Sequence, residues 1–237
     1  MYGCFLAEGE KTVTEILNSD NHLLNIKTLL CTKEYSQSYP AITHKYNHLE
    51  ISEKELKRIS SLKTANMAVL EIEMPEYSIN TKDLYKSYSL FYEEIRDPGN
   101  LGTIIRTADW FGIKNVFCSG QSVDVFNPKT IQSSMGSFAR TKVHYLEFEA
   151  LLSLLKTEKI PLISTELKGE NLYKATIPDH GIIFFGNESK GLSEKISEKC
   201  SQKINIPSGG KNTAESLNLA ISTGIICAEL ARRSYSK

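Results

Sequence analysis

The sequence predicts an α/β protein: a C-terminal part built on a mostly parallel sheet, preceded by a small α/β unit. From about residue 89 onward, short apolar segments alternate with helical patterns, an order typical of parallel sheets flanked by helices. Residues 182–185 are wholly apolar, as in strands that such sheets bury on both faces. A polar segment without a clear period follows Pro75 and separates the two parts.

The first part alternates strand and helix signals. We expect strands at 5–7, 26–31 and 68–74, the last ended by Pro75, and a helix over 8–17 in which Val13, Ile16 and Leu17 recur at helical spacing. Ser52 and Glu55 have the spacing of a capping box that opens a short helix through residue 59. We therefore predict a small α/β domain over 1–78, a linker over 79–86 and a second domain over 87–237.

In the second part the strand and helix signals follow one another closely. The expected strands are 89–95, 115–118, 142–146, 162–166, 182–185 and 203–206. Helices are expected over 103–111, from Pro128, over 147–156, from Ser193, and at the C-terminal end. Gly112 is placed to cap the first of these helices. In sheets of this kind, ligands bind beyond the carboxyl ends of the strands.

Composition excludes several classes of protein. Twenty-eight basic residues offset twenty-eight acidic ones, so binding to nucleic acid requires a local basic patch, for which Arg140 and Lys142 are candidates by charge; a solvated face is an equal reading. No apolar run reaches the ~20 residues that cross a membrane, and the N-terminus lacks a signal-peptide pattern, so we expect a soluble, cytoplasmic protein.

His44 and His48 lack a third ligand nearby, and we expect no metal site. The scattered cysteines indicate free thiols: Cys4, Cys31, Cys118, Cys200 and Cys227.

Two polar loops, at 97–106 and 186–193, each follow an apolar strand. The loop at 97–106 offers Asn100, and Arg106 in the helix after it is either functional or a surface arginine. The loop at 186–193 has the Gly-x-x-x-x-Gly part of a phosphate-binding loop, but Leu192 stands where the essential lysine belongs, which argues against a nucleotide triphosphatase. Glu188 in this loop either caps the next helix or orients another side chain.

A third loop leads from the 203–206 strand into the C-terminal helix, where Glu215, Ser216 and Asn218 stand. The start of a helix offers unpaired amide groups that can hold a polar ligand. Lys211 invites a phosphate interpretation, although Gly-Gly-Lys-Asn also fits a loop tip. The fingerprint Gly-x-Gly-x-x-Gly follows none of the expected strands, which argues against NAD or FAD.

These residues resemble a known family. The segments Asp-Pro-Gly-Asn-Leu-Gly-Thr-Ile-Ile-Arg-Thr-Ala at 97–108, Phe-Phe-Gly-Asn-Glu-Ser-Lys-Gly-Leu at 184–192, and Ile206-Pro207 with Ser216-Leu217-Asn218 are similar to three ordered motifs of the SpoU/TrmH family. Members are S-adenosylmethionine-dependent RNA ribose 2′-O-methyltransferases of the SPOUT class. Residues 5–11, Phe-Leu-Ala-Glu-Gly-Glu-Lys, resemble part of the family's small substrate-binding domain.

The resemblance implies a SPOUT-type sheet whose C-terminal segment forms a trefoil knot, a homodimer, and RNA as the partner. It implies that S-adenosyl-L-methionine is held mainly by backbone groups around Thr165, Gly186, Asn187, Ile206, Pro207 and Leu217. It further implies Arg106 as the catalytic arginine, in a pocket lined by Asn100, Glu188, Ser216 and Asn218. Two departures stand out: residues 209–213 lengthen the loop before Ser216, and the leading basic strand-helix segment that often precedes Phe5 is lacking.

A guanidinium is effectively always protonated, so our hypothesis is that Arg106 positions the target phosphate and stabilises the developing alkoxide, with proton removal assisted by that phosphate. Glu188 and Asn218 would orient Arg106 and the ribose. Ribosomal RNA is the favoured substrate, because a separate N-terminal RNA-binding unit is more typical of members acting there. The alternatives are a transfer-RNA methyltransferase, a catalytically inactive RNA-binding protein of the same fold, and, more distantly, an unrelated α/β protein that binds a small molecule.

Overall fold

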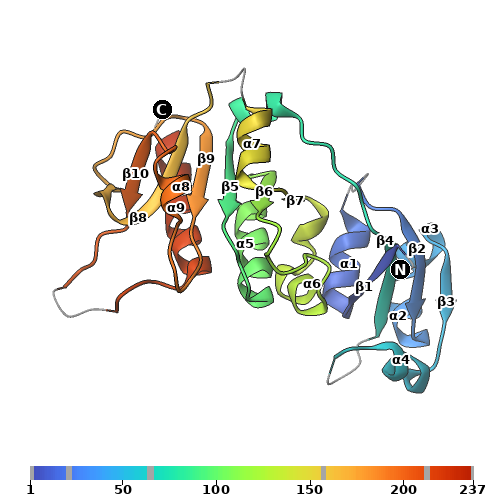
Figure 1. Ribbon diagram of the computed structural model, residues 1–237. Coiled ribbons are helices and arrows are strands. Elements are labelled where there is room, and N and C mark those ends of the chain that lie inside the picture. The colour runs from blue at the N-terminus through green and yellow to red at the C-terminus, as the bar shows by residue number, and fades with distance from the viewer. Residues whose placement is uncertain (1–2, 20–22, 63–66, 156–158, 211–213, 236–237) are drawn as a thin grey trace.

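The computed structural model describes residues 3–19, 23–62, 67–155, 159–210 and 214–235 (Figure 1). The N-terminal unit is a four-stranded sheet in the order β1-β4-β2-β3. Its strands are β1 (Cys4–Glu8), β2 (Ile26–Cys31), β3 (His48–Glu50) and β4 (Ala68–Glu73), and its helices are α1 (Glu10–Asn18), α2 (Lys33–Ser38), α3 (Pro40–Lys45) and α4 (Glu53–Ile59). β4 is antiparallel to both β1 and β2, whereas β3 is parallel to β2.

The capping box predicted at the start of α4 is confirmed, because the side chain of Ser52 accepts from the Glu55 amide while Glu55 accepts from the Ser52 amide. α2, α3 and β3 were not expected from the sequence. They are short, and every residue of β3 is exposed, so neither helical nor alternating hydrophobicity marks them.

The second sheet has six strands in the order β10-β8-β9-β5-β6-β7, and every neighbouring pair is parallel. The predicted parallel sheet is confirmed. Its strands are β5 (Tyr88–Tyr92), β6 (Asn115–Cys118), β7 (Lys142–Tyr145), β8 (Leu162–Asn171), β9 (Gly181–Phe185) and β10 (Gln202–Asn205). The helices are η1 (Thr81–Tyr85), α5 (Pro98–Trp110), α6 (Pro128–Ser134), η2 (Ser137–Ala139), α7 (Phe148–Leu154), α8 (Glu194–Ser197) and α9 (Leu219–Tyr235).

Alternate side chains of the central strands enter two different cores. On β5, Leu90 and Tyr92 join the core that includes residues of α5, α6 and α9, whereas Phe91 joins the core that includes residues of α7 and α8. Because successive side chains of a strand point to opposite faces, helices cover the sheet on both sides. This burial explains why residues 182–185 of β9 are apolar throughout.

Several boundaries differ from the predicted ones. α5 begins at Pro98 rather than at residue 103, because the Asp97 side chain accepts from the Asn100 amide and Pro98 occupies the first helical position. β5 ends at Tyr92, and Glu94 has a left-handed φ of 51°. β8 continues to residue 171 instead of 166. α7 ends at Leu154, and residue 156 lies outside the described residues.

Gly112 caps α5 as predicted. Its φ is +72°, a region that glycine adopts without steric cost. The Ile113 amide donates to Ala108 O at 2.8 Å and the Gly112 amide donates to Asp109 O at 3.0 Å, the hydrogen-bond pattern of a Schellman motif. This motif ends α5 immediately after Trp110 and Phe111.

The N-terminal unit packs against the α6–η2 segment of the second part (Figure 1). The Phe5 ring lies 4.5 Å from the Phe126 ring and 5.6 Å from the Phe138 ring, measured between centroids. Arg140 binds Asp109 in a bidentate ion pair and contacts Glu15 of α1 at 3.2 Å. The core therefore runs without interruption from the first sheet to the second.

Each of the five cysteines is a free thiol. Within the described ranges, none of the helices is long and apolar enough to cross a membrane, and no three His, Cys, Asp or Glu side chains gather as a metal site would need.

Candidate active site

A cavity of about 620 Å³ lies at the end of β10 and beside the part of β8 that follows Ser164, where β8 stops pairing with β9; we call it the strand-end cavity. Its walls come from four segments: residues 165–168, 190–192, 204–209 and 214–217, together with Ser222 and Ile226 of α9. It therefore occupies the place where ligands bind in parallel α/β sheets, beyond the carboxyl ends of the strands.

A shift in strand register opens this cavity. Lys203 of β10 pairs with Ser164 of β8, but the next residue, Ile204, pairs with Glu170. Residues 165–169 of β8 consequently have no partner on β10, and the first four of them line the cavity. Leu167 O accepts from Asn205 Nδ2 of β10 at 3.0 Å, whereas the other backbone groups of this stretch do not pair with β10 and can bind a ligand.

The loop after β9 forms a second wall, and glycine is required at its start. The amides of Asn187 and Gly191 each donate to the carbonyl of the other, at 3.0 and 2.9 Å. This closure brings Gly191 and Leu192 so near Gly186 that a Cβ there would lie 2.1 Å from their backbone atoms. Gly186 thus lets the backbone of Gly191 and Leu192 pack directly against it, and Gly191 and Leu192 line the cavity.

Beside the cavity, three loops bring a polar chain together. Asn100 Nδ2 donates to Glu188 Oε1 at 3.2 Å, and Asn218 Nδ2 donates to Asn100 Oδ1 at 3.1 Å. Asn218 is also the cap of α9, because its Oδ1 accepts from the amides of Ala220 and Ile221. The first amides of α9 are therefore satisfied within the chain, and the helix start is not the open anion site that the sequence allowed.

Two cationic side chains, Arg96 and Lys190, lie beside this polar chain. Arg96 and Lys190 both contact the Glu94 carboxylate, at 3.0 and 3.7 Å, and line the same hollow as Asn100, Glu188 and Asn218. Asn187 lines this hollow rather than the strand-end cavity, and its Nδ2 donates to Glu94 O at 2.9 Å. The pKa of the Asp97 carboxyl is lowered, chiefly by the hydrogen bond from the Asn100 amide.

Glu166 supplies a fixed carboxylate in the cavity wall. Burial raises its pKa, but hydrogen bonds from Ser164 and Ser197 and the charge of Lys203 outweigh burial, so the pKa is lowered overall. Glu166 is therefore ionised at neutral pH and faces the cavity next to Thr165, whose Oγ1 donates to Phe184 O at 3.0 Å.

An ion-pair clamp holds α9, which carries two of the cavity residues. Glu229 is bound by Arg232 and Arg233, and these contacts lower its pKa to about 2, with the hydrogen bond from Arg232 as the largest cause. Arg233 also donates to the backbone carbonyls of Leu172 and Ala175, just after β8. α9 is thereby tied to the strand that forms the opposite wall.

Arg106 lies elsewhere. It is exposed on α5 and lines a separate cleft of about 500 Å³ between the N-terminal unit and α5; we call it the junction cleft. Six residues of α-helix separate Arg106 from Asn100, about 9 Å along the axis and about 240° around it. One chain therefore does not bring Arg106 together with Asn100, Glu188 and Asn218.

The structure thus divides the predicted site residues into three groups, apart from Gly186, which lines none of the three spaces. Thr165, Ile206, Pro207, Ser216 and Leu217 line the strand-end cavity; Asn100, Asn187, Glu188 and Asn218 line the neighbouring hollow; Arg106 lines the junction cleft. Gly209, within the lengthened loop, also lines the cavity, whereas residues 211–213 lie outside the described residues. Of the two candidate RNA contacts, Arg140 forms the bridge between the units and Lys142 begins β7.

Sequence reasoning missed four residues that the structure places at these sites: Arg96, Lys190, Glu166 and Trp110. Arg96 and Lys190 flank or interrupt motifs that were recognised, so their position in the sequence was an available signal. Glu166 and Trp110 had none, because their surroundings depend on a register shift and on the packing of the N-terminal unit.

Two family models match this chain. Residues 87–228 match the model of the SpoU rRNA Methylase family, and residues 1–69 match the MRM3-like substrate binding domain. The chain belongs to the SpoU rRNA methylase family.

Individual relatives cover almost the whole chain. The 23S rRNA (guanosine(2553)-2′-O)-methyltransferase RlmP of Bacillus subtilis is 29% identical over 95% of this chain and 88% of its own length. A TrmH-family protein from Porphyromonas gingivalis has a structure with a TM-score of 0.82 at 33% identity, covering 98% of this chain and 90% of that one. An AdoMet-bound rRNA methyltransferase from Sinorhizobium meliloti has a TM-score of 0.82 at 29% identity, covering 98% and 88%.

Proposed function

We propose that this protein is an S-adenosylmethionine-dependent methyltransferase that methylates a ribose 2′-hydroxyl in RNA, with ribosomal RNA as its substrate class. The observation that carries the proposal is the strand-end cavity with the Glu188–Asn100–Asn218 chain beside it, in a member of the SpoU family. Relatives of almost the same length carry rRNA methyltransferase names, and they include the N-terminal unit.

The residues present fit the cofactor. A volume of about 620 Å³ is in the range that binds small ligands, and the backbone of residues 165–168, which does not pair with β10 apart from the bond of Asn205 to Leu167 O, offers hydrogen bonds to the polar groups of the cofactor. Thr165, Ile206, Pro207 and Leu217 would hold it directly, and Gly186 and Asn187 would support the wall. S-adenosylmethionine supplies an electrophilic methyl group on a sulfonium.

The chain's own residues then position the acceptor. A ribose hydroxyl must be held in line with the methyl carbon while its proton passes to a base, and we assign that role to the target phosphate held by Arg106. Glu188, Asn100 and Asn218 form a preorganised row of acceptors and donors that can orient the ribose, with Ser216 at the rim of the cavity. Arg106 binds the target phosphate and stabilises the developing negative charge on the ribose oxygen, as a fixed cation does best.

We further propose that a homodimer reunites these groups, with Arg106 of one protomer entering the site of its partner. The separation of Arg106 from Asn100 within one chain supports this arrangement. So do two apolar side chains beside the site that remain exposed in the monomer, Ile221 at 55% and Leu217 at 48%. Contact between copies would bury them.

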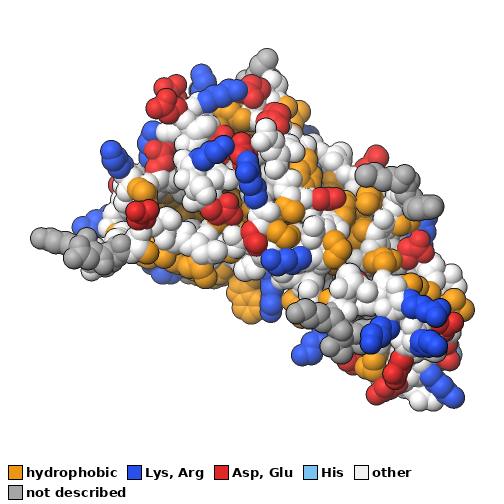
Figure 2. Space-filling model, turned by 60° about the horizontal axis from the view of Figure 1, so that its bottom comes forward, with side chains coloured by type: hydrophobic (Ala, Val, Ile, Leu, Met, Phe, Trp, Pro, Cys, Tyr) orange, Lys and Arg blue, Asp and Glu red, His pale blue; other side chains and the backbone are white. Residues whose placement is uncertain are grey.

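The remaining assignments belong to the same proposal. Substrate binding is assigned to residues 1–78 and catalysis to 87–237, joined by 79–86, with the C-terminal segment threaded as a trefoil knot. Side chains of both charges mix on the N-terminal unit, at right in Figure 2, where α4 carries Lys54, Lys57 and Arg58 for RNA. The protein acts in the cytoplasm and needs no membrane.

The experiment is methyl transfer from labelled S-adenosylmethionine to total rRNA and total tRNA from cells lacking this protein, followed by mapping of ribose methylation. One rRNA ribose should become labelled. Labelling of tRNA alone would identify the protein as a tRNA methyltransferase, the first alternative. Cofactor binding by calorimetry without transfer to either RNA would favour an inactive RNA-binding protein, and no cofactor binding at all would overturn the proposal.

A further inference from the structure

The junction cleft carries an aromatic side chain that nothing described so far uses. Trp110, the last residue of α5, is 84% exposed although it lines a cleft. An indole left in water at the mouth of a cleft offers a flat apolar face on which another ring can stack. It is also the only tryptophan in the sequence.

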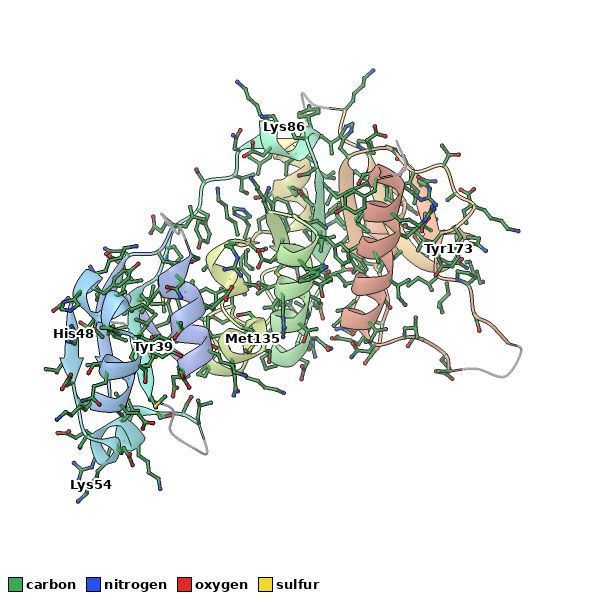
Figure 3. All side chains as sticks on the ribbon, turned by 180° about the vertical axis from the view of Figure 1, so that it is seen from behind. Tyr39, His48, Lys54, Lys86, Met135 and Tyr173 are labelled. Atoms are coloured by element: carbon green, nitrogen blue, oxygen red, sulfur yellow. The ribbon has the colours of Figure 1, made fainter. Side chains whose placement is uncertain are left out.

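Both units of the protein build this cleft. α1 contributes Lys11, Thr14, Glu15 and Asn18, and Tyr39 precedes α3. The other side comes from α5 and from the turn between α6 and η2, where Met135 lies; Tyr39 and Met135 are labelled in Figure 3.

Local contacts hold both sides of the cleft in place. Tyr39 is fixed by a hydrogen bond from its hydroxyl to Glu10 at 2.7 Å. Met135 has φ 50° and Gly136 φ 85°, two successive left-handed residues, and a Cβ on Gly136 would lie 3.1 Å from Glu15. The turn is therefore held tightly against α1.

The charges of the cleft favour an anion. Its two carboxylates, Glu15 and Asp109, are both bound by Arg140, which neutralises them in part. Lys11 and Arg106 form no ion pair with any described residue and are exposed. Two cations thus remain beside an exposed aromatic ring, the combination that binds single-stranded nucleic acid through its phosphates and bases.

Helix geometry links Trp110 to the proposed chemistry. Arg106 and Trp110 are four residues apart on α5 and therefore lie on one face of the helix, as neighbours. We propose that Trp110 stacks on a base of the substrate RNA, next to the nucleotide whose phosphate Arg106 binds, and that Lys11 contacts the following phosphate. The inference rests on the proposed function and adds a base-stacking residue and an RNA-binding site to it.

The single tryptophan allows a direct test. Its fluorescence is measured while single-stranded poly(A) is added at low salt, with double-stranded RNA, whose bases are already stacked, as the comparison. Poly(A) should quench the emission to saturation, and double-stranded RNA should not. If the emission is already that of a buried indole, changes only with protein concentration and ignores RNA, a second copy of the chain covers Trp110 and the proposal is overturned.

Variants separate stacking from charge. Trp110→Ala should weaken poly(A) binding by about fivefold to about a hundredfold, the range measured for loss of one stacked base. Trp110→Phe should retain most of the affinity. Tyr173→Ala is the matched control, because Tyr173 is another exposed aromatic residue, 54% exposed, at the opposite end of the molecule from His48 and Lys54 (Figure 3). Equal affinity of Trp110→Ala and wild type would overturn the proposal.

Activity measurements keep this inference distinct from the proposed function. Trp110→Ala should raise KM for RNA while leaving the affinity for S-adenosylmethionine unchanged, since Trp110 is not part of the strand-end cavity. Wild-type protein that methylates RNA, together with a Trp110→Ala variant of unchanged KM, would defeat the inference alone. Wild-type protein that binds no cofactor and methylates no RNA would defeat the proposed function, whatever the fluorescence shows.

Discussion

The strand-end cavity and the junction cleft are built in different ways. The cavity is lined largely by backbone and small or apolar side chains, and a register shift between two strands of one sheet creates it. The cleft is lined by long charged and aromatic side chains from two units that pack together. A site of the first kind is fixed by the path of the chain, whereas a site of the second kind can change with single substitutions. The cavity is thus suited to a constant ligand and the cleft to a variable one.

The largest effect that would sharpen this comparison is expected at Arg106, in the cleft. Arg106→Ala should lower kcat by about a hundredfold to about a thousandfold, the usual cost of removing one preorganised group that stabilises a developing charge. Binding of S-adenosylmethionine, measured by calorimetry, should not change. Near-normal turnover would show that Arg106 in the junction cleft is not catalytic. Loss of cofactor binding would show that the junction cleft and the strand-end cavity are not independent.

A second experiment asks whether cleft and cavity cooperate between protomers. Ser216→Trp fills the strand-end cavity from an exposed loop position, and Arg106→Ala empties the cleft. Each variant alone should be inactive. When the two variants are co-expressed, the dimers should recover about a quarter of wild-type activity. Half of randomly paired twofold dimers are hybrids, and each hybrid has one complete site in place of two. Recovery of no activity in verified hybrid dimers would place Arg106 in its own chain's site.

A smaller effect is expected in the polar chain of Glu188, Asn100 and Asn218 beside the strand-end cavity. Asn100→Ala removes the link between Glu188 and Asn218 and should lower kcat about tenfold, the equivalent of one hydrogen bond. Thr103→Ala is the control, since Thr103 is exposed on the same helix and its hydroxyl donates to Gly99 O within that helix. Equal kcat for both variants would mean that the chain does not orient the acceptor.

The smallest effect concerns stability, through the clamp on α9. The folded-state pKa of Glu229, about 2, lies below its ordinary value of 4.5, so its contribution is complete above pH 4.5 and is lost as the pH falls towards 2. Glu229→Gln should cost about 1.5–3 kcal/mol at pH 7, the range for hydrogen bonds to a charged group. Denaturant unfolding across this range should show a smaller difference between variant and wild type at acid pH. A difference independent of pH would exclude the ionised clamp.

The sequence predicted the second sheet well because β5, β6 and β9 are buried almost throughout and consist mostly of apolar residues. The strand at 115–118 was expected with the observed bounds, and the motif residues Asn100, Glu188 and Asn218 do meet. The start of α5 was misplaced because Asp97-Pro98-Gly99 has the composition of a turn as well as that of a capped helix.

Other features had no local signal. The exposed strand β3 has no apolar residue in a core, and the location of Arg106 follows from its rotation around α5 relative to Asn100. The junction cleft depends on Arg140 reaching Glu15 across the two units, a contact between residues 125 positions apart in the sequence. Patterns within a window of residues do not encode such contacts.

The clamp between Arg233 and the carbonyls of Leu172 and Ala175 also bears on biosynthesis. The wall formed by Ser222 and Ile226 and the clamp that secures it are among the last described residues of the chain. During translation, every strand of the second sheet is synthesised before these residues exist. The strand-end cavity can therefore close only after Arg233 has been synthesised, and shorter nascent chains have no complete cofactor site.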